Sequence, residues 1–330
     1  PPPPPPSLPP PPPPTPPRHG VRRQRQMCIR DSGKPVNRGG IAGRTEATGK
    51  GVQFALQEFF RHPDAVENAG MVEGLSDNRV VIQGLGNVGF HSAKFLQEQD
   101  KVRVTAIIER DGAVINEDGL NVHDVRQYLV ETGSLKGFPA AEYHENGTEV
   151  LEKECDILIP AALESQIHVG NAMRIQAKLI VEAANGPVTY EANEILLNRN
   201  IAILPDIYVN AGGVTVSYFE WTRNLSHMRF GRLQRRYDEL RGQNLVAAME
   251  ALTQKELPDD VDREISRGAS ELDLVRSGLD DTMRMAFQDL REVMKTYPHI
   301  KDYRTAAYAI AITKIAQSYY DLGLAEPPQH

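Results

Sequence analysis

Hydrophobic residues follow two patterns along this chain, and the change from one to the other divides it. Short, mostly apolar runs bounded by turn-forming residues are typical of buried parallel strands. They occur at residues 80–82, 102–108, 155–160, 179–184 and 201–204. Helical patterns lie between them, so the sequence predicts an α/β fold, a Rossmann-like doubly wound and mostly parallel sheet.

From about Asn210 onward the strand pattern stops and apolar residues recur at helical spacing. We expect helices through residues 245–252, 283–294 and 306–319, with Ser270 capping the start of one of them. The sequence therefore predicts a dinucleotide-binding domain over residues 33–209, followed by a C-terminal helical region over residues 210–330 that completes a substrate cleft.

The first 32 residues have a different composition. Residues 1–17 hold fourteen of the 24 prolines, and the following stretch to Ser32 is basic and aperiodic. A polyproline run forms no core, and no apolar stretch of signal-peptide length follows it. The string Q-M-C-I-R-D-S resembles translated sequencing-adapter read-through, so we interpret residues 1–32 as a disordered tail of artefactual origin. The alternative is a proline-rich ligand for an SH3-like partner.

Charge and cysteine content exclude several functional classes. The 37 basic and 44 acidic residues give a net charge of −7, which argues against nucleic acid, and no run approaches the ~18 apolar residues of a membrane helix. Cys28 and Cys155 are the only cysteines, which excludes a disulfide framework and indicates a reducing, cytoplasmic compartment. The histidines lack the spacing of a metal site.

The sequence R-V-V-I-Q-G-L-G-N-V-G at residues 79–89 reads as a strand, a glycine turn and a helix start. Gly84 permits a tight turn, Gly86 lets backbone approach a pyrophosphate, and Gly89 lets the helix pack against the strand. The first amide groups of the helix would then face the phosphates. The motif predicts dinucleotide binding, although an ordinary tight turn of an α/β protein has the same form.

Glu109 ends the second strand twenty residues after Gly89, where a carboxylate accepts the hydroxyl groups of the adenosine ribose. A carboxylate there repels a 2′-phosphate, but the adjacent Arg110 could pair with one. We predict NAD as the cofactor, with NADP left open.

Several longer motifs resemble the glutamate dehydrogenase family, from residue 33 to about residue 323. They are G-R-T-E-A-T-G-K-G-V at residues 43–52, G-L-G-N-V-G at 84–89, E-A-A-N-G-P at 182–187 and P-D-I-Y-V-N-A-G-G-V-T-V-S-Y-F-E-W at 205–221. Residues 265–279 and 303–308 are similar to the C-terminal region of the animal-type hexameric branch. The resemblance implies a homohexamer.

The resemblance implies a role for each matching position. Thr48 and Asn210 would contact the nicotinamide carboxamide, and Asn185 would lie beside the nicotinamide and its ribose. The backbone at Asn87 and Val88 would meet the pyrophosphate. Amide and hydroxyl groups suit this task because they fix a flat ring without adding charge near the transferred hydride.

Ser217 and Arg44 match positions that hold the carboxylates of the substrate, and a guanidinium binds a carboxylate with two hydrogen bonds. The implied reaction is oxidative deamination of L-glutamate to 2-oxoglutarate and ammonium. A branched-chain or aromatic amino-acid dehydrogenase shares A-G-G-V, but the continuation S-Y-F-E-W favours glutamate. Without the motifs, Ser217 would be interpreted as a helix hydroxyl that bonds its own backbone.

In the family, the catalytic lysine and aspartate lie in a domain before the G-R-x-x-A-T-G motif. Here the proline tail stands in that place, so we assign no catalytic residue and expect a fragment that binds dinucleotide with little or no turnover. The alternative from another functional class is a noncatalytic dinucleotide-binding module that associates with other subunits.

Overall fold

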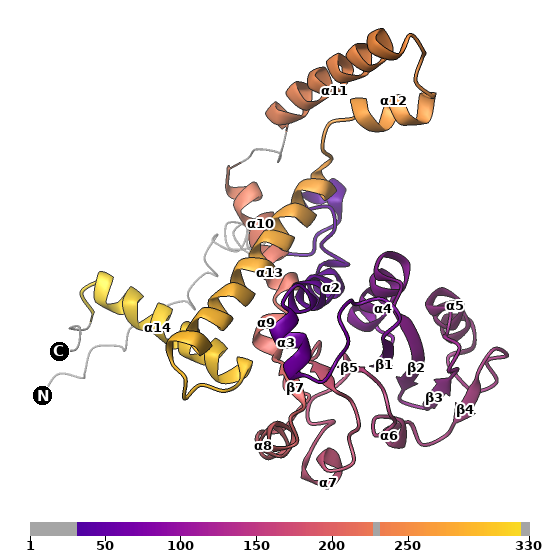
Figure 1. Cartoon of the computed structure of the whole chain (residues 1–330), viewed down its shortest axis with the longest axis vertical. Helices are drawn as coiled ribbons and strands as arrows, with labels where there is room; N and C mark the ends of the chain where they lie inside the picture. Colours follow the sequence, from indigo (N-terminus) through magenta and orange to yellow (C-terminus); the bar gives the residue numbers. More distant parts are fainter. Residues whose placement is uncertain (1–31, 227–231, 325–330) are drawn as a thin grey trace, which may run out of the picture.

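The computed structural model describes residues 32–226 and 232–324 (Figure 1). The predicted tail, apart from Ser32, and Cys28 lie outside the described residues. The strands are β1 (Arg79–Gln83), β2 (Arg103–Glu109), β3 (Gly112–Ile115), β4 (Glu142–His144), β5 (Ile157–Pro160), β6 (Leu179–Val181) and β7 (Ala202–Leu204). The helices before β7 are η1 (Val36–Arg38), α2 (Ala47–Phe60), α3 (Pro63–Asn68), α4 (Asn87–Asp100), α5 (Val122–Thr132), α6 (Gly147–Val150), α7 (Val169–Ala172) and α8 (Tyr190–Asn198). Those after it are α9 (Asp206–Val209), α10 (Gly212–Ser226), α11 (Arg232–Thr253), α12 (Asp259–Ser266), α13 (Glu271–Thr296) and α14 (Tyr303–Asp321).

The seven strands form one sheet in the order β4-β3-β2-β1-β5-β6-β7. The five strands that the sequence predicts pair in parallel with one another, which confirms the doubly wound α/β fold. β3 and β4 add an antiparallel edge beyond β2 that the sequence did not predict. β3 lies between two turns only a few residues apart, and the three residues of β4 have no apolar pattern, so neither produced a strand signal.

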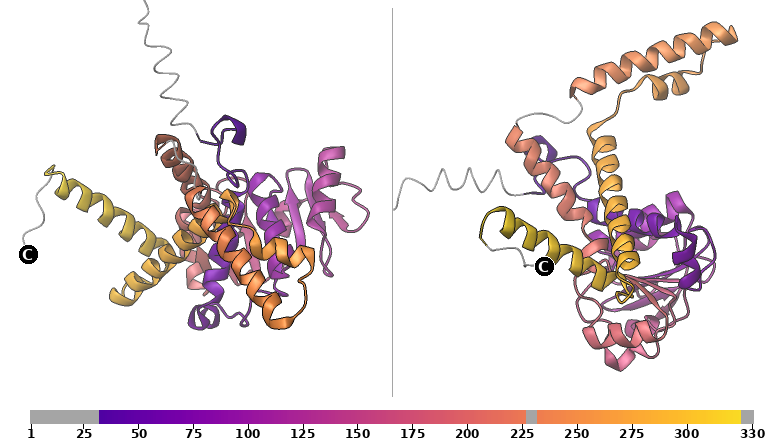
Figure 2. Two further views of the ribbon diagram at one scale, coloured as in Figure 1. Left: turned by 90° about the horizontal axis from the view of Figure 1, so that it is seen from above. Right: turned by 60° about the vertical axis from the view of Figure 1, so that its left-hand side comes forward.

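Side chains on the two faces of the sheet enter two separate cores, because successive residues of a strand point to opposite faces. In β1, Val80 and Ile82 belong to the core that α2, α4 and α13 cover. Val81 belongs to the other core, which α6, α7 and α8 cover. Figure 2 shows the sheet enclosed between these layers. The apolar runs therefore face a core on both sides of the sheet, and the polar residues between these runs lie in the connections between strands and helices.

The order of the parallel strands fixes where a ligand can enter. The chain steps from β1 to β2 on one side and from β5 through β6 to β7 on the other. Connections that leave in opposite directions open a crevice at the carboxyl ends of β1 and β5, which is the usual ligand site of such sheets. The glycine turn follows β1 at this edge.

The C-terminal helices are joined to the sheet layer through α2. The buried side of α13 contributes one residue per turn to the same core as α2 and β1, namely Val275, Leu279, Met283, Phe287 and Leu290. Ser270 caps α13 as predicted, in a capping box with Asp273. A single core therefore crosses the boundary that we predict at residue 209/210.

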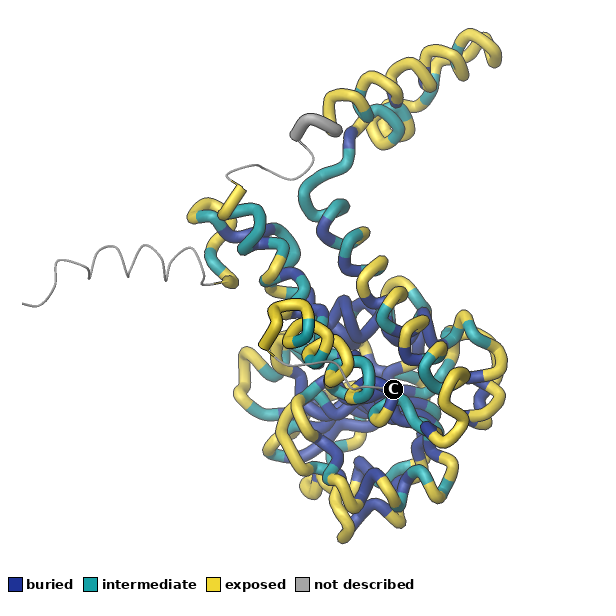
Figure 3. The backbone as a smooth tube through the Cα atoms, turned by 90° about the vertical axis from the view of Figure 1, so that its left-hand side faces the viewer, coloured by how far each residue is buried: buried dark blue, intermediate teal, exposed yellow. Residues whose placement is uncertain are grey.

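Helices α11 and α12 project from this body as a hairpin (Figure 3). α12 buries no residue, and α11 leaves Tyr237, Leu240 and Leu252 more than half exposed. Within residues 32–226 and 232–324, none of the helices has the length and apolarity needed to cross a membrane.

Candidate active site

A cleft of about 1030 Å³ opens at the carboxyl ends of β1, β5 and β6, between the sheet and the helices α2 and α10. Six of the residues predicted from the sequence line it: Arg44, Thr48, Val88, Asn185, Asn210 and Ser217. The remaining five, Gly84, Gly86, Asn87, Gly89 and Glu109, lie in the adjoining glycine turn, the start of α4 and the end of β2. Residues between 44 and 217 in the sequence therefore meet at one edge of the sheet.

The glycine turn has the geometry that its sequence predicts. Gly84 has a φ of +88°, which is a left-handed backbone that favours glycine. A Cβ on Gly89 would lie 1.8 Å from the Gly84 carbonyl oxygen, so only glycine allows α4 to pack this closely. A Cβ on Gly86 would meet nothing within 4 Å. Gly86 precedes α4 with no side-chain cap, which leaves the first amides of the helix to a ligand.

Glu109 is held against the glycine turn at the end of β2. Its Oε1 accepts a hydrogen bond from the backbone amide of Leu85, and the guanidinium of Arg126 donates to the Leu85 carbonyl at 2.7 Å. Glu109 Oε2 has no hydrogen-bond partner among residues 32–226 and 232–324. No sequence motif points to Arg126, because its helix is remote from the glycine motif in the chain.

Two loops bring Asn185 and Asn210 together on the opposite wall of the cleft. The side-chain amide of Asn210 donates to Asn185 Oδ1 at 2.7 Å. Asn185 follows β6, whereas Asn210 follows the short helix α9 after β7. The 24 residues between them return the chain to the same edge, because β6 and β7 are parallel neighbours.

Arg44 and Ser217 meet between the segment before α2 and the helix α10. Arg44 Nε donates to Ser217 Oγ at 2.8 Å, and Ser217 Oγ also donates to the Gly213 carbonyl at 2.9 Å. The hydrogen bond from Ser217 to its own helix backbone is therefore present together with its contact to Arg44. Neither terminal nitrogen of Arg44 has a hydrogen bond or ion pair within the described part of the chain, so both can bind a carboxylate.

Two glycines at the start of α10 bring Thr48 to the cleft. A Cβ on Gly213 would lie 2.5 Å from Thr48 Oγ1, and a Cβ on Gly212 would lie 2.4 Å from the Ala47 carbonyl oxygen. The A-G-G sequence therefore has a packing role, since it allows α10 to approach α2 closely.

Among the described residues that line the cleft there is neither a lysine nor an aspartate, and the single carboxylate is that of Glu164. No group of three His, Cys, Asp or Glu residues in the described ranges could hold a metal ion. Cys155 is buried, and burial raises the pKa of its thiol to about 12, so it is not a nucleophile. The described lining thus holds hydroxyl, amide and guanidinium groups and one carboxylate.

One wall of the cleft was not predicted from the sequence. Ala161, Ala162, Leu163, Glu164 and Gln166, which follow β5, line it. Gln166 is fixed by the side chain of Gln83, which donates to its Oε1 at 2.7 Å. Small residues directly after a buried strand were the available signal, because the carboxyl end of β5 had to lie next to that of β1.

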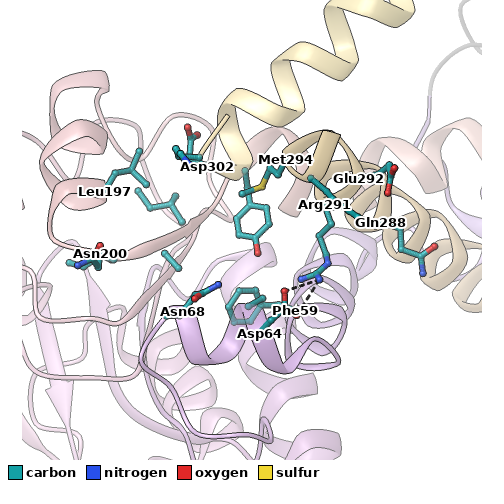
Figure 4. A pocket seen from close by; sticks show the side chains of 18 residues that line it. Phe59, Asp64, Asn68, Leu197, Asn200, Gln288, Arg291, Glu292, Met294 and Asp302 are labelled. Carbon is teal, nitrogen blue, oxygen red and sulfur yellow. Dashed lines mark hydrogen bonds and ion pairs between the residues drawn. The ribbon is translucent and has the colours of Figure 1, made fainter. Parts of the chain in front are cut away.

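A second hollow of about 710 Å³ lies between α3, the end of α13 and the start of α14 (Figure 4). It contains Ile201 and Ala202 at the amino end of β7, so it is at the opposite edge of the sheet from the glycine turn. Arg291 and Asp64 form an ion pair across it, at 2.9 and 3.1 Å. None of the predicted site residues lines this hollow.

Residues 39–270 match the family described as Glutamate/Leucine/Phenylalanine/Valine dehydrogenase. The chain belongs to this family. It is 48% identical over 287 residues to a probable glutamate dehydrogenase of Sinorhizobium fredii, covering 86% of this chain and 64% of that protein. It is also 48% identical to the mitochondrial glutamate dehydrogenase of Dictyostelium discoideum, covering 88% of this chain and 58% of that protein.

A crystal structure of glutamate dehydrogenase from Peptoniphilus asaccharolyticus has the same fold. The TM-score is 0.64 at 28% identity, over 92% of this chain and 60% of that one. Our chain therefore spans about six tenths of the length of these family members. The expected resemblance to glutamate dehydrogenases is confirmed for the part of the family fold that the chain covers.

Proposed function

We propose that the protein to which this chain corresponds catalyses the NAD(P)-dependent oxidative deamination of L-glutamate to 2-oxoglutarate and ammonium. The observation that carries the proposal is Arg44, which lines the cleft and donates through Nε to Ser217, while its terminal nitrogens have no hydrogen bond or ion pair among the described residues. A guanidinium prepared in this way binds a carboxylate, and a module that only binds dinucleotide has no need for one.

In this proposal the cofactor lies across the crevice. The glycine turn and the first amides of α4 bind the pyrophosphate, and Glu109 binds the adenosine ribose. Thr48, Asn185 and Asn210 hold the nicotinamide end of the cofactor. When bound, the nicotinamide ring would accept the hydride from Cα of the substrate. The carboxylate of Glu109 supports NAD as the preferred form.

We further propose a homo-oligomer, a homohexamer by resemblance, located in the cytoplasm. The exposed apolar side chains of α11 and α14 support self-association, since large exposed apolar patches are typical of interaction surfaces. The net charge of −7 and the absence of a membrane-length apolar run in the sequence support a protein that works apart from nucleic acid and membranes.

The test is ligand binding to the purified chain. NADH binding is followed by quenching of protein fluorescence, and 2-oxoglutarate is then titrated into the complex. We expect 2-oxoglutarate to bind and Arg44→Gln to weaken it about tenfold or more, while leaving NADH binding unchanged. The matched control is Arg61→Gln, because Arg61 flanks the other end of α2 and pairs with Glu58.

The same titration separates the alternatives. Binding of a branched-chain or aromatic oxo acid in preference to 2-oxoglutarate would assign the chain to another substrate class of the family. NADH binding with no oxo-acid binding would favour the noncatalytic module.

A further inference from the structure

Arg304 lies in the first turn of α14, and its side chain contacts three other segments. Nη2 donates to Glu182 Oε1 at 2.6 Å, Nε to Asn193 Oδ1 at 3.0 Å, and Nη1 to Asp206 Oδ1 at 3.4 Å. These acceptors follow β6, lie in α8 and begin α9. One guanidinium therefore joins three segments that the sequence separates from it by about a hundred residues.

Glu182 and Asp206 also bind each other's loops. The backbone amide of Asp206 donates to Glu182 Oε2 at 2.8 Å, and the amide of Gly186 donates to Asp206 Oδ2 at 2.8 Å. Both carboxylates thus use one oxygen for Arg304 and the other for a backbone amide. The result is a closed network that fixes the loop after β6 relative to the start of α9.

These are the two segments that carry the asparagine pair. Asn185 precedes Gly186 directly, and Asn210 follows α9 by one residue. Their side chains touch at 2.7 Å only while the two segments keep their present separation. Arg304 contacts neither Asn185 nor Asn210, so any influence on them passes through its acceptors Glu182, Asp206 and Asn193.

The network is buried enough for each partner to matter. Glu182 is fully buried, and the Arg304 side chain is 19% exposed. Burial raises the pKa of the Glu182 carboxyl, and the guanidinium opposes this shift. Removing one member of a buried ion pair leaves the other charge without compensation, which is strongly unfavourable.

The backbone of Arg304 is itself held firmly. Asp302 caps α14 by accepting from the Thr305 amide at 2.8 Å, and it is visible at the rim of the second hollow (Figure 4). The ring of Tyr303 packs on Phe287, with 5.4 Å between ring centroids. A fixed start of α14 gives the long side chain of Arg304 one geometry instead of several.

We propose that Arg304 is a positioning residue, which sets Asn185 and Asn210 against the nicotinamide end of the cofactor by clamping Glu182 and Asp206. The inference rests on the proposed function, because it requires that end of the cofactor to lie at the asparagine pair. It assigns α14 a part in the cofactor site although no residue of α14 lines the cleft.

The experiment compares two ligands on the full chain. NADH reaches both the glycine turn and the asparagine pair, whereas ADP contains neither nicotinamide nor its ribose. We expect Arg304→Gln and Arg304→Lys to weaken NADH binding about tenfold and to leave ADP binding unchanged. An effect of this size is common when a residue that holds a binding side chain in place is lost. Lysine keeps the charge but cannot reach three acceptors in a fixed fork.

The matched control is Arg291→Gln. Arg291 also joins distant segments through a paired carboxylate, Asp64, but at the second hollow. This variant lowers stability without changing NADH binding if the inference holds. A second test uses the double variant Asn185→Ala, Asn210→Ala, in which Arg304→Lys should cause no further loss of NADH affinity.

Each outcome decides the question. Three results would overturn the inference. Both Arg304 variants weaken NADH and ADP binding equally, or neither changes NADH binding, or Arg304→Lys causes its full loss of NADH affinity again in the double-variant background. If the unmodified chain binds ADP but the asparagine double variant keeps full NADH affinity, the proposed cofactor site is wrong and the inference falls with it.

Discussion

Gly86 and Gly89 stand three residues apart in one turn, and their surroundings place opposite demands on them. A side chain at Gly89 would collide with the Gly84 carbonyl, whereas a side chain at Gly86 would point into open space. Gly86 also has an ordinary φ of −70°, which any residue adopts. Packing alone therefore requires glycine at residue 89 and not at residue 86.

This contrast gives a paired prediction. Gly89→Ala should destabilise the fold by about 1–3 kcal/mol or more through overpacking, seen as a lower Tm. Gly86→Ala should change stability by no more than about 0.5 kcal/mol and weaken NADH binding about tenfold, because its methyl group occupies the path of the pyrophosphate. Thermal unfolding and NADH titration of both variants are the measurements. An unaffected NADH affinity in Gly86→Ala would contradict the proposed cofactor path.

Glu109 carries the prediction on cofactor choice. We expect the chain to bind NADH more tightly than NADPH, because a 2′-phosphate would approach the carboxylate. Glu109→Gln keeps an oxygen for the Leu85 amide and removes the charge, so the preference should fall by about tenfold. Competition titrations with the two reduced cofactors measure it. A preference that survives in this variant would mean that another residue selects the cofactor.

At the scale of elements, the contact between α2 and α4 contains a buried lysine. Lys50 Nζ donates to Gln53 Oε1 at 2.5 Å and to Gln99 Oε1 at 2.7 Å, and it lies 4.6 Å from the centre of the Phe95 ring. Burial lowers the pKa of Lys50 from 10.5 to about 8, with a smaller contribution from Arg276. The same two helices carry Thr48 and the uncapped amides that we propose bind the pyrophosphate.

The lowered pKa of Lys50 predicts a pH dependence of stability. Between about pH 8 and pH 10.5 the unfolded chain holds this proton more strongly than the folded chain, so folding stability attributable to Lys50 rises with pH across that window. Below pH 8 the amine is charged in both the folded and the unfolded chain, so the free-energy cost of burying it no longer changes with pH. The Tm advantage of Lys50→Met over the unmodified chain should therefore decrease from pH 8 to pH 10.5. Parallel Tm curves for the two proteins would refute the assignment.

For the whole molecule, the described lining of the cleft contains no lysine or aspartate that could transfer a proton. We therefore expect the purified chain to bind NADH and yet produce no NADH from NAD and L-glutamate above the blank rate. The formation of NADH is measured by its absorbance at the nicotinamide band. A glutamate-dependent rate that Arg44→Gln abolishes would contradict this expectation and show that the chain supplies its own proton relay.

Much of this organisation could be predicted from residue order. Apolar runs of strand length and the glycine motif determined the five parallel strands and the site of the turn, because both depend on local chemistry. The capping box at Ser270 is local in the same sense. β3 and β4 could not be predicted, since β3 exists only by pairing with β2, and β4 only by pairing with β3.

Contacts between distant residues were decided by the tertiary structure alone. The sequence by itself determined that Arg44, Ser217, Asn185 and Asn210 belong to motifs that resemble one family, but their meeting depends on parallel strands that end at one edge. The clamp of Arg304 on Glu182 and Asp206 left no trace in the sequence pattern. A side chain's partners across a hundred residues depend on how whole elements pack, and no periodicity records that.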